Sequence, residues 1–351
     1  MRAPERSPLS SDLNELLARA PGLWEELRGA RVFLTGGTGF FGVWLVESLI
    51  RANRALDLDA RASVLTRNEA AFLAKNPHLA GAPELSFHRG DVRSFDFPSS
   101  VFTHVISAAA EAGVRLDREP PDQMRDVIVS GTRRTLDFAA ACGAKRFLFA
   151  SSGAVYGRQR PDAALVDEDD PGLTAPLAAP SAYAEGKREA ERLCVSAAGQ
   201  GLGATIARGF AFAGPGLPLD AGFAIGNFIR DALAGGPIVV EGDGTPVRSY
   251  LYAADLAEWL WTILLKGEAG RAYNVGSERS VSIVELAELV RAVVDPSVEI
   301  LVLQSPGPGT RAERYVPSTR RAREELGLKE TVGLEEAIRR TAAWAAFEAA
   351  A

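Results

Sequence analysis

The sequence predicts an α/β protein built on a doubly wound parallel sheet, with a smaller, mostly C-terminal α/β region after it. Two observations carry this prediction. Short apolar runs typical of buried strands alternate with helical segments through residues 30–210. A glycine-rich turn joins the first of these runs to the first long helix, as in a sheet whose parallel strands are connected by helices.

The first half of the chain supplies most of the expected strands. Residues 1–29 read as an N-terminal helical extension, in which Ser10, Ser11 and Asp12 are expected to cap a short helix. Within residues 30–210 we expect strands at 32–35, 62–65, 85–88, 105–107, 146–150 and 204–207, and helices at 39–52, 121–141 and 181–198.

The alternation loosens after Gly214-Pro215. Residues 211–351 are therefore predicted to form mainly the smaller, substrate-binding region, and the chain is expected to return to the large domain near 238–256. Helices are expected at 224–234, 254–266, 282–293 and 332–348, and short strands at 238–240, 272–275 and 298–303.

The composition is that of an ordinary globular protein. Hydrophobic residues make up 47% and charged residues 24%, with a net charge of −6. An acidic balance does not favour nucleic acid or an anionic membrane as a partner. The charged N-terminus lacks the apolar stretch of a signal peptide, and no apolar run approaches the ~20 residues of a membrane span. We therefore expect a cytoplasmic protein without a membrane partner.

Cysteine and histidine are scarce. Two cysteines, Cys142 and Cys194, cannot build a disulfide framework and are expected to be reduced. The three histidines, His78, His88 and His104, have no second histidine or cysteine at ligand spacing, so we expect no protein-bound metal.

The glycine-rich turn is the first motif that carries chemistry. Gly36-x-x-Gly39-x-x-Gly42 follows a strand and opens a helix, and Thr38, Phe40 and Phe41 lie between and beside its glycines. Glycines there allow a tight turn and let a pyrophosphate approach backbone N–H groups at the helix N-terminus. Residues 30–210 are thus assigned as a dinucleotide-binding domain of the Rossmann type.

Three further positions are expected to contact the dinucleotide. Arg67, at the end of the second strand, stands where NAD-selective folds often carry an acid, and it would pair with a 2′-phosphate. NADP(H) is therefore favoured and NAD(H) is the alternative, while a solvated surface arginine is the other interpretation of Arg67. Asp91 and Val92 follow the third strand and would meet the adenine, although Asp91 also fits a plain turn. Ala109 follows the fourth strand.

A tyrosine and a lysine one helical turn apart suggest the reaction. Tyr183 and Lys187 have i, i+4 spacing and so share one face of the helix at 181–198. A free tyrosine has a pKa near ~10. A nearby ammonium and a positively charged nicotinamide would lower it, which suits general acid–base catalysis. Ser152, at the end of the fifth strand, is expected at the same edge of the sheet, where its hydroxyl would bond the reacting oxygen; a turn serine is the other reading.

These motifs together resemble the extended short-chain dehydrogenase/reductases, in particular the nucleotide-sugar epimerase, dehydratase and reductase group. The similarity runs from about residue 31 to 327 and includes Ala150-Ser-Ser-Gly-Ala-Val-Tyr-Gly157 and Tyr273-Asn-Val-Gly276. It implies Ser152, Tyr183 and Lys187 as catalytic residues, Lys187 also holding the nicotinamide ribose, a nucleotide-sugar substrate and a homodimer formed through the helices at 121–141 and 181–198. It also implies a substrate-binding set, each member of which has an ordinary surface or loop role as its alternative: Glu111, Ser152, Asn227, Arg248 and Arg311.

The chain departs from the family pattern at four places. The acid pair that 4,6-dehydratases carry after the catalytic hydroxyl is Gly153-Ala154 here, which argues against dehydration. Two polar anchors of the family are replaced by Ala211 and Ile128. Three functions remain open: reduction of a 4-keto (6-deoxy) sugar nucleotide with Tyr183 as the proton donor, which is preferred; C4 epimerisation with a retained cofactor; and a non-catalytic NADP-binding protein.

Overall fold

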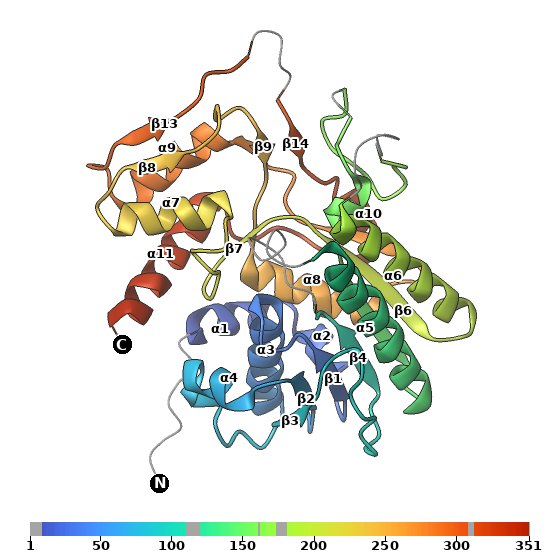
Figure 1. The fold of residues 1–351 in the computed structure, drawn as a ribbon. Helices are drawn as coiled ribbons and strands as arrows, with labels where there is room; N and C mark the ends of the chain where they lie inside the picture. Colours follow the sequence, from blue (N-terminus) through green and yellow to red (C-terminus); the bar gives the residue numbers. More distant parts are fainter. Residues whose placement is uncertain (1–8, 110–119, 161, 173–180, 308–311, 351) are drawn as a thin grey trace.

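The computed structural model describes residues 9–109, 120–160, 162–172, 181–307 and 312–350 (Figure 1). Its centre is a seven-stranded sheet in which every pair of neighbours is parallel, in the order β11-β6-β5-β4-β1-β2-β3. This confirms the predicted fold class. The strands are β1 (Arg31–Thr35), β2 (Arg61–Thr66), β3 (Leu85–Arg89), β4 (His104–Ser107), β5 (Arg146–Ser152), β6 (Gly203–Gly209) and β11 (Ala272–Val275).

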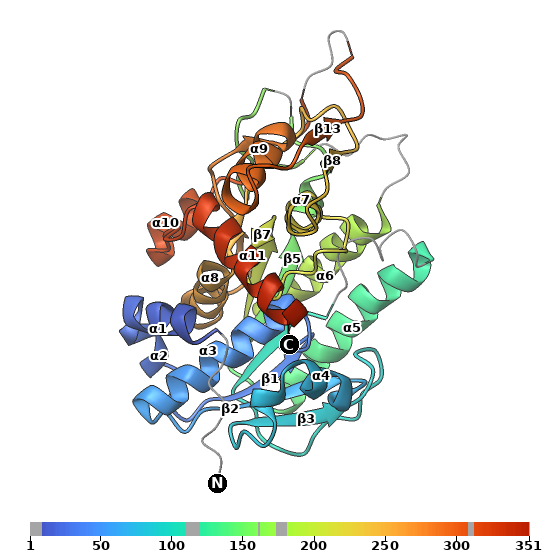
Figure 2. The same ribbon diagram turned by 90° about the vertical axis from the view of Figure 1, so that its left-hand side faces the viewer.

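Helices cover both faces of this sheet (Figure 2). One face carries α3 (Phe40–Leu56) and α8 (Ala253–Lys266), and the other carries α5 (Pro121–Ala141) and α6 (Ala182–Gly199). Because both faces are covered, the central strands are apolar along their whole length; Val32, Phe33 and Leu34 of β1 are all fully buried.

The smaller region lies beyond the C-terminal ends of the central strands (Figure 1). In it, α7 (Ala224–Leu233), α9 (Ile283–Val294) and α11 (Leu334–Ala350) pack together beside the parallel pair β8 (Ile238–Val240) and β13 (Ile300–Val302). A second small sheet has the order β12-β9-β14, and its strands are β12 (Val281–Ser282), β9 (Val247–Arg248) and β14 (Arg314–Tyr315). A third pair joins β7 (Phe212–Ala213) to β10 (Leu251–Tyr252).

The chain returns to the large domain later than expected. The strand at 238–240 pairs with β13 and stays in the smaller region. The return is instead made by α8, which packs on β5 and β6, and by β11, which pairs with β6 at the edge of the large sheet. The expected return near 238–256 is thereby moved to 253–275, because the short apolar run at 238–240 finds its strand partner at 300–302.

Several short elements were not expected. They are α2 (Pro21–Glu25), α4 (Glu69–Lys75), α10 (Arg320–Leu326) and the 3₁₀ turns Pro77–Leu79 and Gly153–Tyr156. Each has seven residues or fewer, which is too short for an apolar repeat to establish a helical period. α3 also continues four residues past its expected end at residue 52, to Leu56.

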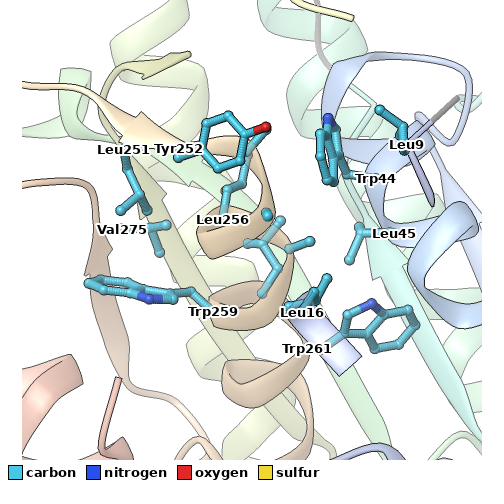
Figure 3. Close-up of a cluster of buried hydrophobic side chains, with 14 of the residues drawn as sticks. Leu9, Leu16, Trp44, Leu45, Leu251, Tyr252, Leu256, Trp259, Trp261 and Val275 are labelled. Carbon is cyan, nitrogen blue, oxygen red and sulfur yellow. The ribbon is translucent and has the colours of Figure 1, made fainter. Parts of the chain in front are cut away.

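The N-terminal extension is part of the main core rather than an appendage. Leu9 and Leu16 lie with Trp44 and Leu45 of α3 and Trp261 of α8 in one buried apolar cluster (Figure 3). This cluster joins α1 (Ser10–Arg19) to α3 and α8, so removing α1 would expose their apolar faces.

The polar side of α1 faces the C-terminal end of the chain. The expected cap does not form, because Leu9 is the N-cap residue and no side chain caps α1. Asp12 is instead buried and bonded to Arg340 of α11, which also binds Glu15 at 3.1 Å. A second ion pair joins Arg19 to the fully buried Asp255 of α8 at 2.9 Å.

Candidate active site

The glycine turn is shaped so that backbone groups can approach a ligand. Gly36 has φ +71°, and a Cβ there would lie 2.3 Å from the carbonyl oxygen of Ala108. A Cβ on Gly42 would lie 2.3 Å from Cα of Gly37. Gly39 is the N-cap of α3 and supplies no side-chain cap. The first-turn N–H groups of α3 are therefore left for a ligand, and an anion at this helix end is favoured.

A cavity of about 510 Å³ opens beside this turn. Its volume is in the range of small-molecule sites. It brings together most of the residues predicted to bind a dinucleotide: Gly36, Thr38, Gly39, Arg67, Asp91, Val92 and Ala109. The rings of Phe40 and Phe41 do not line it, and Phe41 packs edge-on against Phe212 with ring centroids 5.0 Å apart. The residues present thus fit the adenosine and phosphate part of a dinucleotide.

The far end of the cavity is rich in positive charge. Arg67 lines both this cavity and an adjoining one that also contains Arg89. Asp91 is bound by Arg93 through both carboxylate oxygens, at 2.9 and 3.0 Å. The Arg93 hydrogen bond lowers the pKa of Asp91 to about 2, so this carboxylate is charged at neutral pH and already paired. The charge of Arg67 adds to this lowering, so Arg67 and Asp91 lie close enough for their charges to interact.

Tyr183 and Lys187 both lie on the first turns of α6, as predicted. Ser181 caps the helix through a hydrogen bond from the Ala184 N–H to its hydroxyl at 3.4 Å. Lys187 is buried, and its Nζ donates to the Ala150 carbonyl on β5 at 2.7 Å and lies 5.5 Å from the centroid of the Tyr183 ring. Burial lowers the pKa of Lys187 to about 8, against the opposing charge of Glu191.

Ser152 stands where the sequence placed it, at the end of β5. Its Oγ accepts a hydrogen bond from the Ala154 N–H at 3.2 Å and lies within hydrogen-bonding reach of the Tyr183 phenol. Burial raises the pKa of Tyr183, and the Ser152 hydroxyl opposes this rise only in part. Lys187, which was expected to lower this pKa, does not contribute to the shift, and desolvation determines its direction. Tyr183 is a neutral phenol here, ready to donate its proton.

The replaced family positions are filled by packing. Gly153 leaves no space for a side chain, because a Cβ there would lie 2.6 Å from the Tyr315 hydroxyl and 2.8 Å from the Phe210 ring. Ile128 of α5 packs against Gly186 of α6 and also lines the cavity beside the glycine turn. At position 153 apolar contacts take the place of the acid that elimination would need, and at position 128 an apolar side chain takes the place of a polar anchor.

The residues predicted to bind substrate are not all gathered at one place. Arg248 on β9 binds Glu313 at 3.1 Å, and its guanidinium lies 6.0 Å from the centroid of the Tyr315 ring. Asn227 lies on α7, a half-buried residue among helices of the smaller region. Glu111 and Arg311 lie outside the described residues.

Two aromatic residues at the site were missed by sequence reasoning. Tyr315 lies within hydrogen-bonding reach of Ser152, and its ring packs against Phe210 with centroids 4.6 Å apart. Phe210 stands in the Arg208-Gly-Phe-Ala211 segment, which suggested only a lost amide. Tyr315 belongs to a two-residue strand, so neither period nor motif pointed to it.

Other parts of the described chain offer no competing centre. Within residues 9–109, 120–160, 162–172, 181–307 and 312–350, no three histidine, cysteine, aspartate or glutamate side chains gather as a metal site would need. Cys142 and Cys194 are free thiols. No helix in this described part is both long and apolar enough to cross a bilayer.

Comparison with known proteins identifies the family. Residues 32–276 match the model of the NAD dependent epimerase/dehydratase family. The chain is 31% identical over 315 residues to UDP-glucuronic acid decarboxylase 1 of Arabidopsis thaliana, covering 88% of this chain and 68% of that protein. It is 31% identical over 312 residues to UDP-glucuronic acid decarboxylase 6 of the same plant, covering 88% and 86%.

Solved structures share the whole fold. A UDP-glucose 4-epimerase from Thermotoga maritima superposes with a TM-score of 0.77 at 22% identity, covering 91% of this chain and 99% of that one. A dTDP-glucose 4,6-dehydratase from Streptomyces venezuelae, with NAD bound, superposes with a TM-score of 0.75 at 25% identity, covering 91% and 98%.

Proposed function

Because this chain belongs to the NAD dependent epimerase/dehydratase family, we propose that it is an enzyme that transfers hydride at C4 of a nucleotide sugar and that its net reaction is the reduction of a 4-keto (6-deoxy) sugar nucleotide. One observation carries the proposal. The Tyr183 phenol is kept neutral by burial beside Ser152 and Lys187, while the two positions after Ser152 are Gly153 and Ala154 and supply no acid.

The chemistry follows from these groups. A bound NADPH or NADH would supply the hydride for a new C–H bond at the sugar C4. Tyr183 donates its proton to the ketone oxygen, so a carbonyl becomes a secondary alcohol. The Ser152 hydroxyl and the Lys187 ammonium then stabilise the phenolate that remains on Tyr183. Without an acid at position 153 or 154, elimination of water has no carboxyl group directly after Ser152 to move protons.

We also propose NADP(H) as the preferred cofactor. Arg67 and Arg89 both face the cavity that adjoins the dinucleotide pocket, and a guanidinium can hold a 2′-phosphate by two hydrogen bonds. NAD(H) is the alternative, because it is the cofactor in the family's own description. The substrate diphosphate is assigned to Arg248, with Asn227, Glu111 and Arg311 as further contacts.

Two other net reactions use the same hydride step. In a C4 epimerase the ketone forms from the bound sugar and is reduced on its other face, without net oxidation; the fold likeness to the Thermotoga enzyme supports this candidate. In a decarboxylase, a ketone at C4 is β to the C6 carboxylate of a uronic acid, which can then leave as CO₂. The identity with the two Arabidopsis proteins supports that third candidate.

Incubation with a panel of nucleotide sugars distinguishes the three candidate reactions: reduction, C4 epimerisation and decarboxylation. We expect consumption of dihydronicotinamide, mole for mole with a 4-hydroxy product, when a 4-keto nucleotide sugar is supplied. Tyr183→Phe is the matched control, because it removes only the proton donor. A new stereoisomer without cofactor consumption would replace the reductase by the epimerase. Release of CO₂ from UDP-glucuronic acid would replace it by the decarboxylase.

We further propose that two copies pair through α5 and α6. These helices pack side by side on one face of the sheet (Figure 1), and Val195 of α6 is an apolar side chain with 50% exposure. Light scattering should give a dimer mass for the wild type and a lower mass for Val195→Glu. A monomeric wild type would contradict the proposal.

A further inference from the structure

Tyr315 reaches the active site from the smaller region. Its strand β14 pairs in parallel with β9, which places Tyr315 beside Arg248. The segment that follows is fixed to the loop at Val166 by two backbone hydrogen bonds, Val166 N–H to the Val316 carbonyl at 3.1 Å and Ser318 N–H to the Val166 carbonyl at 2.7 Å. The Tyr315 phenol is thus held in place from both sides.

The phenol occupies the space in front of Gly153. A Cβ on Gly153 would lie only 2.6 Å from the Tyr315 oxygen. The missing side chain at this position is therefore what lets Tyr315 come within reach of Ser152. A side chain at position 153 and the Tyr315 phenol would occupy the same space, so the absence of the family acid allows this second tyrosine to enter the site.

The hydrogen-bonding capacity of Ser152 decides what the second phenol does. A hydroxyl has one proton to donate and two lone pairs that accept. One lone pair takes the Ala154 N–H at 3.2 Å. The remaining lone pair and the proton serve two phenols, Tyr183 and Tyr315, which both lie within hydrogen-bonding reach. Once Tyr183 has become a phenolate it can only accept a hydrogen bond, so it takes the Ser152 hydrogen, and the remaining lone pair of Ser152 is left for the Tyr315 hydroxyl.

We propose that Tyr315 is a positioning residue of the active site, which donates its phenol hydrogen to Ser152 Oγ and so directs the Ser152 hydrogen towards Tyr183. This inference rests on the proposed hydride chemistry, in which Tyr183 ends each reduction as a phenolate and accepts a hydrogen bond from Ser152. A chain of hydrogen bonds from Tyr315 through Ser152 also polarises the Ser152 hydroxyl and strengthens its bond to the phenolate.

The surroundings of Tyr315 favour this direction of donation. Burial raises the pKa of both Tyr315 and Tyr183, and the two phenols differ in that Tyr183 lies beside Lys187, whose Nζ is 5.5 Å from the centroid of its ring. Arg248, the only guanidinium recorded over the Tyr315 ring in the described residues, lies 6.0 Å from its centroid and opposes the rise at Tyr315 only in part. Tyr183 is the phenol that loses its proton in the reaction, and Tyr315 is the one that does not.

The test uses Tyr315→Phe, which keeps the ring that packs on Phe210. Ultraviolet difference titration of the enzyme–NADP⁺ complex, with Tyr183→Phe as the subtracted reference, follows ionisation of Tyr183 without any turnover. We expect its midpoint to move up by about half a pH unit to one unit in Tyr315→Phe, because the phenolate loses a polarised donor. With a 4-keto substrate, kcat should fall roughly 3- to 10-fold with little change in KM. In the pH dependence of kcat, the alkaline limb should move to higher pH by the same amount as the titration midpoint.

Two further variants make the result decisive. Tyr273→Phe removes another buried tyrosine hydroxyl, one that donates to Glu325 of α10 at 3.2 Å, and should leave the titration unchanged. In a Ser152→Ala background, Tyr315→Phe should have no further effect on the midpoint, because the intermediate hydroxyl is gone. An unchanged midpoint in Tyr315→Phe, or an equal shift in the Ser152→Ala background, would overturn the proposal. Because the titration needs no sugar, its result stands even if the net reaction is not a reduction.

Discussion

Asn274 offers a sharp test of how the site is supported. It is fully buried on β11, and its side chain makes three hydrogen bonds: Oδ1 accepts from the Tyr156 hydroxyl at 2.7 Å, and Nδ2 donates to the carbonyls of Val166 and Ser318, each at 3.0 Å. Asn274→Leu keeps the volume and removes all three bonds. Ser318 lies three residues after Tyr315, so the substitution also loosens the segment that carries that phenol.

The magnitude follows from what each partner retains. The Val166 carbonyl still accepts the Ser318 N–H, so it is not orphaned. The Tyr156 hydroxyl still accepts from Arg208 at 2.8 Å but has no acceptor for its own proton, and the Ser318 carbonyl loses its side-chain donor. Two unsatisfied groups at about 1–3 kcal/mol each, reduced by relaxation, predict a loss of about 2–4 kcal/mol in the free energy of unfolding.

Urea unfolding followed by tryptophan fluorescence measures this change. Tyr156→Phe in the same background is the matched second variant, since it removes the orphaned hydroxyl. The double variant should be more stable than the sum of the two single losses by about 1 kcal/mol or more. A loss below about 0.5 kcal/mol in Asn274→Leu, or strict additivity, would refute the reasoning.

Three further predictions concern the chemistry, the cofactor and the pH dependence of stability. Tyr183→Phe should lower turnover by at least about 10²-fold while dinucleotide binding, measured by fluorescence titration, is retained; normal turnover would remove Tyr183 from the mechanism. Arg67→Ala should raise the Kd for NADP⁺ about tenfold and leave that for NAD⁺ nearly unchanged, because only the former carries the 2′-phosphate; parallel changes would end the argument for NADP(H). Burial and the charges of Arg146 and Lys145 lower the pKa of His104 from 6.5 to about 4, so the unfolded chain takes up a proton there before the folded one does. Stability from this group is complete above pH 6.5 and is lost as the pH falls towards 4, by on the order of 2–3 kcal/mol, and His104→Gln should flatten that part of the stability curve; an unaltered curve in the variant would assign the loss to other groups.

The parts of the site that are local in sequence could be predicted, and those that depend on distant partners could not. The turn at Gly36 is recognisable in the sequence from three glycines between a strand and a helix. Tyr183 and Lys187 share one face of α6 because they are one helical turn apart. Ser152 was found because parallel strands end at a common edge. Arg67 and Asp91 reached the same cavity for that reason.

Tyr315 could not be predicted, because its place depends on a two-residue strand and on the empty space at Gly153. The direction of the pKa shift of Tyr183 could not be predicted from the sequence either. The i, i+4 spacing predicts that Lys187 lies near Tyr183, but the pKa of Tyr183 depends on how far burial removes water from its phenol. The late return of the chain had a similar cause, since an apolar run such as 238–240 does not identify its partner strand.

The contact between α1 and α11 has a consequence for biosynthesis. Asp12 and Arg340 are 328 residues apart in the chain. At the usual ~5–20 residues per second, Arg340 leaves the ribosome roughly 20–60 seconds after Asp12. Through that interval the first helix has no partner for its acidic face, and Asp255, the partner of Arg19, also emerges late. The apolar side of α1 can therefore dock on α3 as soon as that helix is made, whereas its ion pairs with Asp255 and Arg340 form only after α8 and α11 have left the ribosome.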